Sequence, residues 1–234
     1  MKLLSGAIDF LLGGPKVGGR DEERLRRWFA TPPASLVLPH GRARYVVVAI
    51  EASGVGTRRE RLFSLEAIAV DGLRIDLSDC FGAVLRQRRP SDAADIVTHG
   101  IGGEAQLGGV EPAAAMLGFL EDLRKAPLVA FPAGATSGVV ERAMRRVLGV
   151  PFEHPWLDLA ALLPALHPEA GCATLVQWLE RSGLAEGLRG DAPASPIAVA
   201  QLLQSALDAA TRAGFVNAWQ LVELQQAPRG MDPR

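Results

Sequence analysis

Residues 45–50 have the sequence YVVVAI, an uninterrupted apolar run in which most side chains are β-branched. A short run of this kind, without polar alternation, is typical of a strand that is buried on both of its faces. The next four residues, 51–54, are EASG, and they place one carboxylate directly after the run. We therefore expect a strand in the interior of a sheet, with Glu51 where that strand ends.

The residues that follow predict more strands and then helices. An antiparallel meander is expected from strands at residues 61–70, 73–77 and 81–87, and Asp71-Gly72 is a turn signal within it. Downstream, apolar spacing predicts helices and two short buried strands, the helices at 112–125, 137–148, 174–181 and 196–213, the strands at 128–131 and 156–159. This order predicts an α/β fold, with helices packed on a mixed sheet that is antiparallel at its edge.

Residues 1–43 look like a helical appendage to this sheet. Glycines and a proline within 13–19 separate an amphipathic helix expected at 1–12, for which a signal peptide is the alternative, from a charged helix at 22–30. We therefore expect three parts: a helical N-terminal extension (1–43), a domain that contains the sheet (44–212), and a C-terminal helix and tail (213–234).

Composition limits the possible functions. Of the 234 residues, 48% are hydrophobic and 22% are charged, which is ordinary for a soluble globular protein. The formal net charge of -1 argues against a protein that binds nucleic acid by its overall positive charge. Two cysteines give neither a disulfide framework nor a zinc pattern, so a reducing cytosol is expected. No apolar stretch is long enough for a membrane helix, so we expect a cytoplasmic protein without a membrane partner.

The order of these elements resembles a known family. A strand followed by Glu51, the hairpin, His99-Gly100-Ile101 and the strand at 128–131 together resemble the proofreading 3'-5' exonucleases, the DnaQ-like or DEDDh family. The likeness is to the epsilon subunit of bacterial DNA polymerase III and its epsilon-like relatives, and it covers about residues 44–212, with the extension included for one bacterial subgroup. It implies a ribonuclease H-like fold and metal-dependent trimming of DNA or RNA ends.

The residues at the family's catalytic positions differ from its pattern. The first motif, Asp-x-Glu, is matched by Ala49 and Glu51. The Asp of the second motif corresponds to Thr136, and the His and Asp of the third motif correspond to Gly190 and Ser195. Only one of five positions, Glu51, therefore keeps the residue type that the resemblance requires.

These differences bear on the mechanism that the resemblance implies. Two divalent cations clamp the scissile phosphate in such enzymes, and hard cations need several carboxylate ligands. One carboxylate is too few, so we expect that catalysis is lost and that no metal is bound. If the chain is active instead, we expect Mg²⁺ or Mn²⁺ as the cofactor and Glu51 as a ligand of the metal. Asp191, Asp158, Glu104 and Glu66 are the candidates for a compensating carboxylate.

Nucleic-acid contact is expected beside the first motif. The candidate residues are Ser53, Gly54, Arg58, Arg59 and His99. The arginines within 86–89 add phosphate-binding capacity if they converge on the same cleft, although a solvated surface is the alternative for every arginine cluster. For His99, the alternative is a structural histidine in the turn before Gly100.

Three functions remain open from the sequence. The first is a catalytically inactive exonuclease relative that binds single-stranded DNA or RNA, or a protein. The second is an active 3'-5' exonuclease with displaced metal ligands. The third is a regulatory scaffold without a nucleic-acid role, which binds a protein or a second copy of itself through the N-terminal extension.

Overall fold

The computed structural model describes residues 16–185 and 195–227 and contains one five-stranded sheet with the order β3-β2-β1-β4-β5. The strands are β1 (Arg44–Ser53), β2 (Arg61–Asp71), β3 (Arg74–Val84), β4 (Leu128–Ala130) and β5 (Trp156–Asp158). β1, β2 and β3 pair antiparallel, whereas β1, β4 and β5 pair parallel. The predicted mixed sheet with an antiparallel edge is therefore confirmed.

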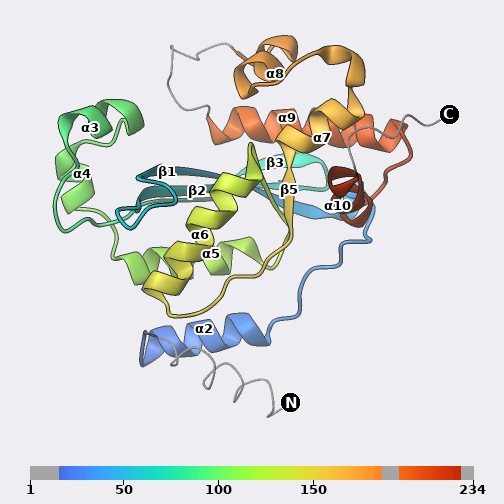
Figure 1. Cartoon of the computed structure of the whole chain (residues 1–234). Helices are drawn as coiled ribbons and strands as arrows, with labels where there is room; N and C mark the ends of the chain where they lie inside the picture. The colour runs from blue at the N-terminus through green and yellow to red at the C-terminus, as the bar shows by residue number, and fades with distance from the viewer. Residues whose placement is uncertain (1–15, 186–194, 228–234) are drawn as a thin grey trace.

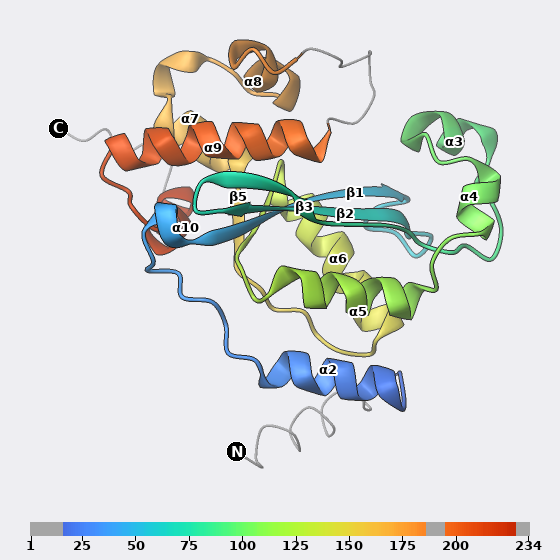
Figure 2. The ribbon, with the colours of Figure 1, turned by 180° about the vertical axis from the view of Figure 1, so that it is seen from behind.

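Helices cover both faces of this sheet (Figures 1 and 2). They are α2 (Arg20–Ala30), α3 (Ala93–His99), α4 (Gly103–Leu107), α5 (Pro112–Leu123), α6 (Ala133–Val147), α7 (Leu159–Leu166), α8 (Leu175–Arg181), α9 (Pro196–Arg212) and α10 (Ala218–Gln226). α5 and α6 lie on one face, and α7, α8 and α9 lie on the other, while α3 and α4 stand at the end of the sheet where β1 terminates. Among the described helices, none is both long and apolar enough to cross a membrane.

β1 lacks polar alternation because both of its faces are buried. Val46 and Val48 belong to the core under α5 and α6, and Tyr45 and Val47 belong to the core under α9. All four side chains are at most 3% exposed. Burial on both faces removes the need for polar residues, as the sequence of this run predicts.

The prediction of separate strands at 73–77 and 81–87 is wrong, because one strand, β3, replaces them. Its pairing with β2 shifts in register between Ile68, which faces Cys80, and Ala69, which faces Asp76. The extra residues include Asp79, which forms an ion pair with Arg44 at 2.6 Å. The polar residues that suggested a break between two strands therefore form a bulge within a single strand.

No helix or strand is predicted from the sequence between residues 88 and 111, but the structure has α3 and α4 there. The carboxylate of Asp92 caps α3 by accepting a hydrogen bond from the Asp95 amide at 2.9 Å, and Gly100 ends it with φ 71. Helices of seven and five residues are too short to show a helical apolar period. His99 is therefore the last residue of a helix rather than part of a loop.

α2 packs against α5 as an additional layer beneath the sheet (Figure 1). Leu25 and Trp28 are buried in the same core as α5 and α6, and Arg24 binds both carboxylate oxygens of Glu121 at 2.8 Å. The apolar face of the predicted helix at 22–30 is thus covered by this chain itself. The helix predicted at 1–12 lies outside the described residues.

Candidate functional site: the pocket at the end of β1

The candidate pocket is a cavity of about 480 Å³ at the carboxyl end of β1. Its walls come from β1 and β2, the end of α3, the starts of α6, α8 and α9, and the residue that follows β4. It brings together four of the five motif positions named from the sequence, Ala49, Glu51, Thr136 and Ser195. The fifth, Gly190, lies outside the described residues.

Glu51 projects from β1 on the α9 side of the sheet, the side on which Tyr45 and Val47 are buried. Its side chain forms no hydrogen bond or ion pair with any described residue. Burial, together with the nearby negative charge of Glu66, raises the pKa of Glu51 above its usual value. A carboxylate in this setting is available to a ligand that carries positive charge or hydrogen-bond donors.

Glu66 is a second carboxylate in the candidate pocket, and it lies directly opposite Ala49 in the pairing of β1 with β2. Glu66 therefore lies beside Ala49, the position at which the family motif has an aspartate. From the sequence, Glu66 is only one of four candidates for a compensating carboxylate, because its position depends on the register of the hairpin. Of the others, Glu104 and Asp158 do not line the pocket, and Asp191 lies outside the described residues.

Two of the three hydroxyl side chains that line the pocket already form hydrogen bonds in the first turns of helices. Thr136 Oγ1 donates to the carbonyl of Pro132 at 3.2 Å, and Ser195 Oγ caps α9 by accepting from the amide of Ile197 at 3.3 Å. Asp158 has a comparable structural role, because its carboxylate accepts hydrogen bonds from the amides that begin α6 and α7.

These donors do not fit a pair of divalent cations. In the part of the chain that the structure describes, no three His, Cys, Asp or Glu side chains are placed to share a metal ion. Two carboxylates and three neutral hydroxyls, those of Ser64, Thr136 and Ser195, supply too little negative charge for two hard cations held close together.

His99 lines the candidate pocket but has no free ring nitrogen. Nδ1 accepts a hydrogen bond from the amide of Ile101 at 3.0 Å, so Nε2 of the neutral ring donates to Ser91 Oγ at 3.1 Å. The ring packs on Phe63 with centroids 4.4 Å apart. Gln106, which is fully buried, donates to Ser91 Oγ and to the carbonyl of Ile101. These contacts make His99 part of a fixed wall.

Ser53, Gly54, Arg58 and Arg59 do not line the pocket; they belong to the end of β1 and the β1–β2 hairpin. Both arginines are exposed and form no ion pair with any described residue. The structure therefore separates these four candidates from the motif positions, and it places their arginines on the surface of the loop.

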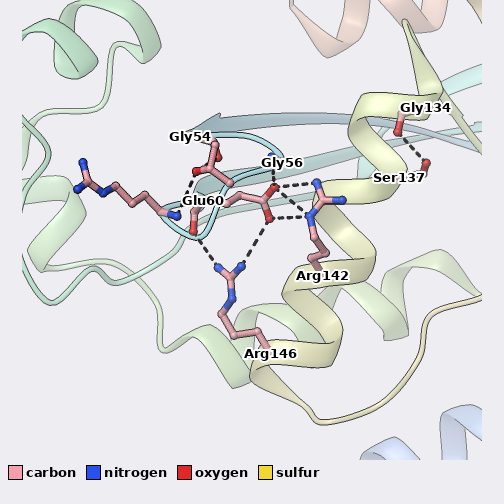
Figure 3. Close-up of polar contacts among 9 residues, drawn as sticks. Gly54, Gly56, Glu60, Gly134, Ser137, Arg142 and Arg146 are labelled. Carbon is pink, nitrogen blue, oxygen red and sulfur yellow. Dashed lines mark hydrogen bonds and ion pairs between the residues drawn. The ribbon is translucent and has the colours of Figure 1, made fainter.

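A buried ion pair holds this hairpin against α6 (Figure 3). Glu60 accepts hydrogen bonds from Arg142, the shortest at 2.7 Å, and from the amide of Gly56 at 3.0 Å, while Arg146 donates to the Glu60 carbonyl at 2.8 Å. Burial alone would raise the pKa of Glu60, but the hydrogen bonds from Arg142 and Gly56 outweigh it and keep this pKa below its usual value.

No family model matches the chain, and no curated protein matches its sequence. Its structure is similar to several solved nucleases. Cell-death related nuclease 4 (CRN-4) superposes with a TM-score of 0.60 at 13% identity over 76% of this chain and 68% of that one. Exonuclease X in complex with 5' overhanging duplex DNA gives 0.56 at 16% identity over 77% and 99%.

The nuclease domain of 3'hExo, a DEDDh family member bound to rAMP, gives a TM-score of 0.58 at 11% identity over 75% of this chain and 96% of that domain. At sequence identities this low, structural similarity shows a shared fold but not a shared activity. The chain therefore has the ribonuclease H-like α/β fold of the DEDDh-type exonucleases.

Proposed function

We propose that this chain binds the end of a nucleic-acid strand in the candidate pocket and has lost two-metal cleavage. One observation carries the proposal: the pocket stands at the carboxyl end of β1 and keeps Glu51, while Ala49, Thr136 and Ser195 occupy three of the other motif positions as neutral side chains. The cavity can receive a ligand, but the charge needed for catalysis by paired cations is missing.

Nucleic acid is the ligand class that the structural comparisons favour. Exonuclease X was solved with overhanging duplex DNA, and the 3'hExo nuclease domain was solved with rAMP. A volume of about 480 Å³ is within the range of small-molecule sites and suits a terminal nucleotide.

The test is to incubate the purified chain with Mn²⁺ and a labelled single-stranded oligonucleotide. We expect binding that survives chelation of the metal, without shortening of the strand. The controls are Glu51→Gln, within the pocket, and Glu104→Gln, an exposed residue outside it. Progressive shortening that Glu51→Gln abolishes and Glu104→Gln leaves intact would overturn the proposal.

An active exonuclease with displaced ligands is the second candidate, and the position of Glu66 opposite Ala49 favours it. Here a carboxylate from β2 replaces the one that β1 lacks. This candidate predicts shortening that is lost in both Glu51→Gln and Glu66→Gln. Shortening that persists in Glu66→Gln would exclude Glu66 from that role.

A further inference from the structure

A second cavity, here called the basic cavity, lies where β2 begins. Its volume is about 480 Å³, and it is lined by Arg61 from β2 and by Gln87, Arg88 and Arg89 from the segment that follows β3. Three guanidinium groups around one cavity select for an anion, and their planar donor geometry suits phosphate.

Neutral groups hold Arg61 in place without cancelling its charge. Its Nε donates to Gln87 Oε1 at 3.3 Å, and its terminal nitrogen donates to the carbonyl of Arg89. The guanidinium lies 5.0 Å from the centre of the Phe63 ring. Gln87 is itself fixed, because its amide nitrogen donates to two backbone carbonyls. Arg61 and Gln87 are thus held in place before any ligand arrives, which lowers the cost of ordering these two side chains on binding.

Among the described residues, no acidic side chain pairs with the arginines of the basic cavity. The neighbouring Arg86 pairs with Glu111. In contrast, Arg61, Arg88 and Arg89 form no ion pair with any residue that the structure describes, and the last two are exposed. A guanidinium group without an ion pair can bind an anion without first breaking an ion pair within the protein.

A chain of side-chain contacts connects the basic cavity to the candidate pocket. Arg61 lies over the Phe63 ring, that ring packs on His99, and His99 lines the candidate pocket. A strand whose end occupies the pocket and which continues past these side chains would bring the phosphates that precede its end toward the arginines.

We infer that Arg61, Arg88 and Arg89 bind the sugar–phosphate backbone of the nucleic-acid strand whose end lies in the candidate pocket. This inference rests on the function proposed above and adds a second contact site to it. The lining offers guanidinium and amide groups but no aromatic ring, so the contact is to phosphates and does not depend on base sequence.

The test compares two double substitutions that remove equal charge. Arg88→Gln/Arg89→Gln alters the basic cavity, whereas Arg42→Gln/Arg74→Gln removes two exposed arginines, also without ion pairs to described residues, from the opposite end of the β1–β2 pair. Binding of a labelled thymidine oligonucleotide is measured by fluorescence anisotropy in a metal chelator, between about 50 and 200 mM salt. Arg61 is left intact because it supports the surrounding backbone.

We expect Arg88→Gln/Arg89→Gln to weaken binding by about tenfold and to reduce the slope of log affinity against log salt by about 1.4, or ~0.7 for each lost phosphate contact. Arg42→Gln/Arg74→Gln should leave both quantities unchanged.

If the unaltered chain binds and both double variants bind as tightly, the basic cavity is not a backbone site, while the proposed function stands. An unaltered chain with no affinity for the oligonucleotide overturns both proposals. Polyglutamate binding that depends on Arg88 and Arg89, without oligonucleotide binding, would assign the cavity to an acidic peptide.

Discussion

Glu51 and Glu66 occupy the same pocket from adjacent strands, and neither forms a hydrogen bond or ion pair with a described residue. Burial of the Glu51 side chain disfavours its charged form, and the negative charge of Glu66 disfavours it further. This explains why burial and Glu66 together raise the pKa of Glu51. The charged form of Glu51 therefore carries an electrostatic cost in the folded chain.

This cost predicts that Glu51→Gln stabilises the chain at neutral pH. Because the pKa of Glu51 is higher in the folded state than in the unfolded state, the folded state binds more protons between these two values. The free energy of unfolding therefore falls as pH rises through that window. Above this pH window, we expect Glu51→Gln to increase the free energy of unfolding by at most about 1 kcal/mol, which corresponds to roughly 2–4 °C in Tm. Below pH ~4, we expect almost no increase.

The measurement is thermal unfolding by circular dichroism across this pH range, with the exposed Glu104→Gln as the matched control. A gain that is equal at acid and neutral pH would come from packing and not from charge. A loss at neutral pH would contradict the assignment of a raised pKa.

At the scale of elements, the Glu60 ion pair predicts how the β1–β2 hairpin is held. Glu60→Ala removes the acceptor of the Gly56 amide and of Arg142, and it removes the ion pair of Arg146 at 3.6 Å, whereas the hydrogen bond from Arg146 to the backbone carbonyl of residue 60 remains. The Glu60 side chain is 2% exposed, but that of Arg142 is 45% exposed and can turn to water. We therefore expect a loss of about 2 kcal/mol rather than the larger cost of a fully buried pair.

Hydrogen exchange followed by mass spectrometry checks this prediction, because residues 54–60 should exchange faster in Glu60→Ala than in the unaltered chain. The exposed Glu104→Gln should show no change in that peptide. Since the pKa of Glu60 is lowered by folding, its stabilisation is present above its unfolded pKa and is lost as pH falls through the folded value. A hairpin equally protected in both variants would mean that Glu60 does not anchor it.

The elements also show what the sequence could predict. β1 and the helices with a clear apolar period were found because burial on one or two faces leaves a direct trace in the sequence. The bulge in β3 and the short α3 were not found, since polar residues and short length hide them. Ala49, Glu51, Thr136 and Ser195 were placed by motif order, but the position of Glu66 opposite Ala49 needed the hairpin register, which the sequence does not specify.

At the scale of the whole molecule, α2 joins the core instead of standing apart from it. Trp28 is 9% exposed, and its ring lies 3.1 Å from Nζ of Lys125. Burial lowers the pKa of Lys125 to about 8. The division into an extension at 1–43 and a domain at 44–212 stays a prediction, and α2 gives a way to test it.

If α2 and the sheet form one cooperative unit, Trp28→Ala should destabilise the entire chain by about 3–5 kcal/mol and leave a single unfolding transition. Trp219, which is 50% exposed, provides the matched control, because Trp219→Ala removes the same side chain from a site with little burial. A second readout is specific to the contact. Trp28→Ala exposes the ammonium group of Lys125, so NMR titration should find the pKa of Lys125 rising from about 8 toward its ordinary range. An unchanged transition for the sheet, with Lys125 still titrating near its lowered value, would show that α2 belongs to a separate unit.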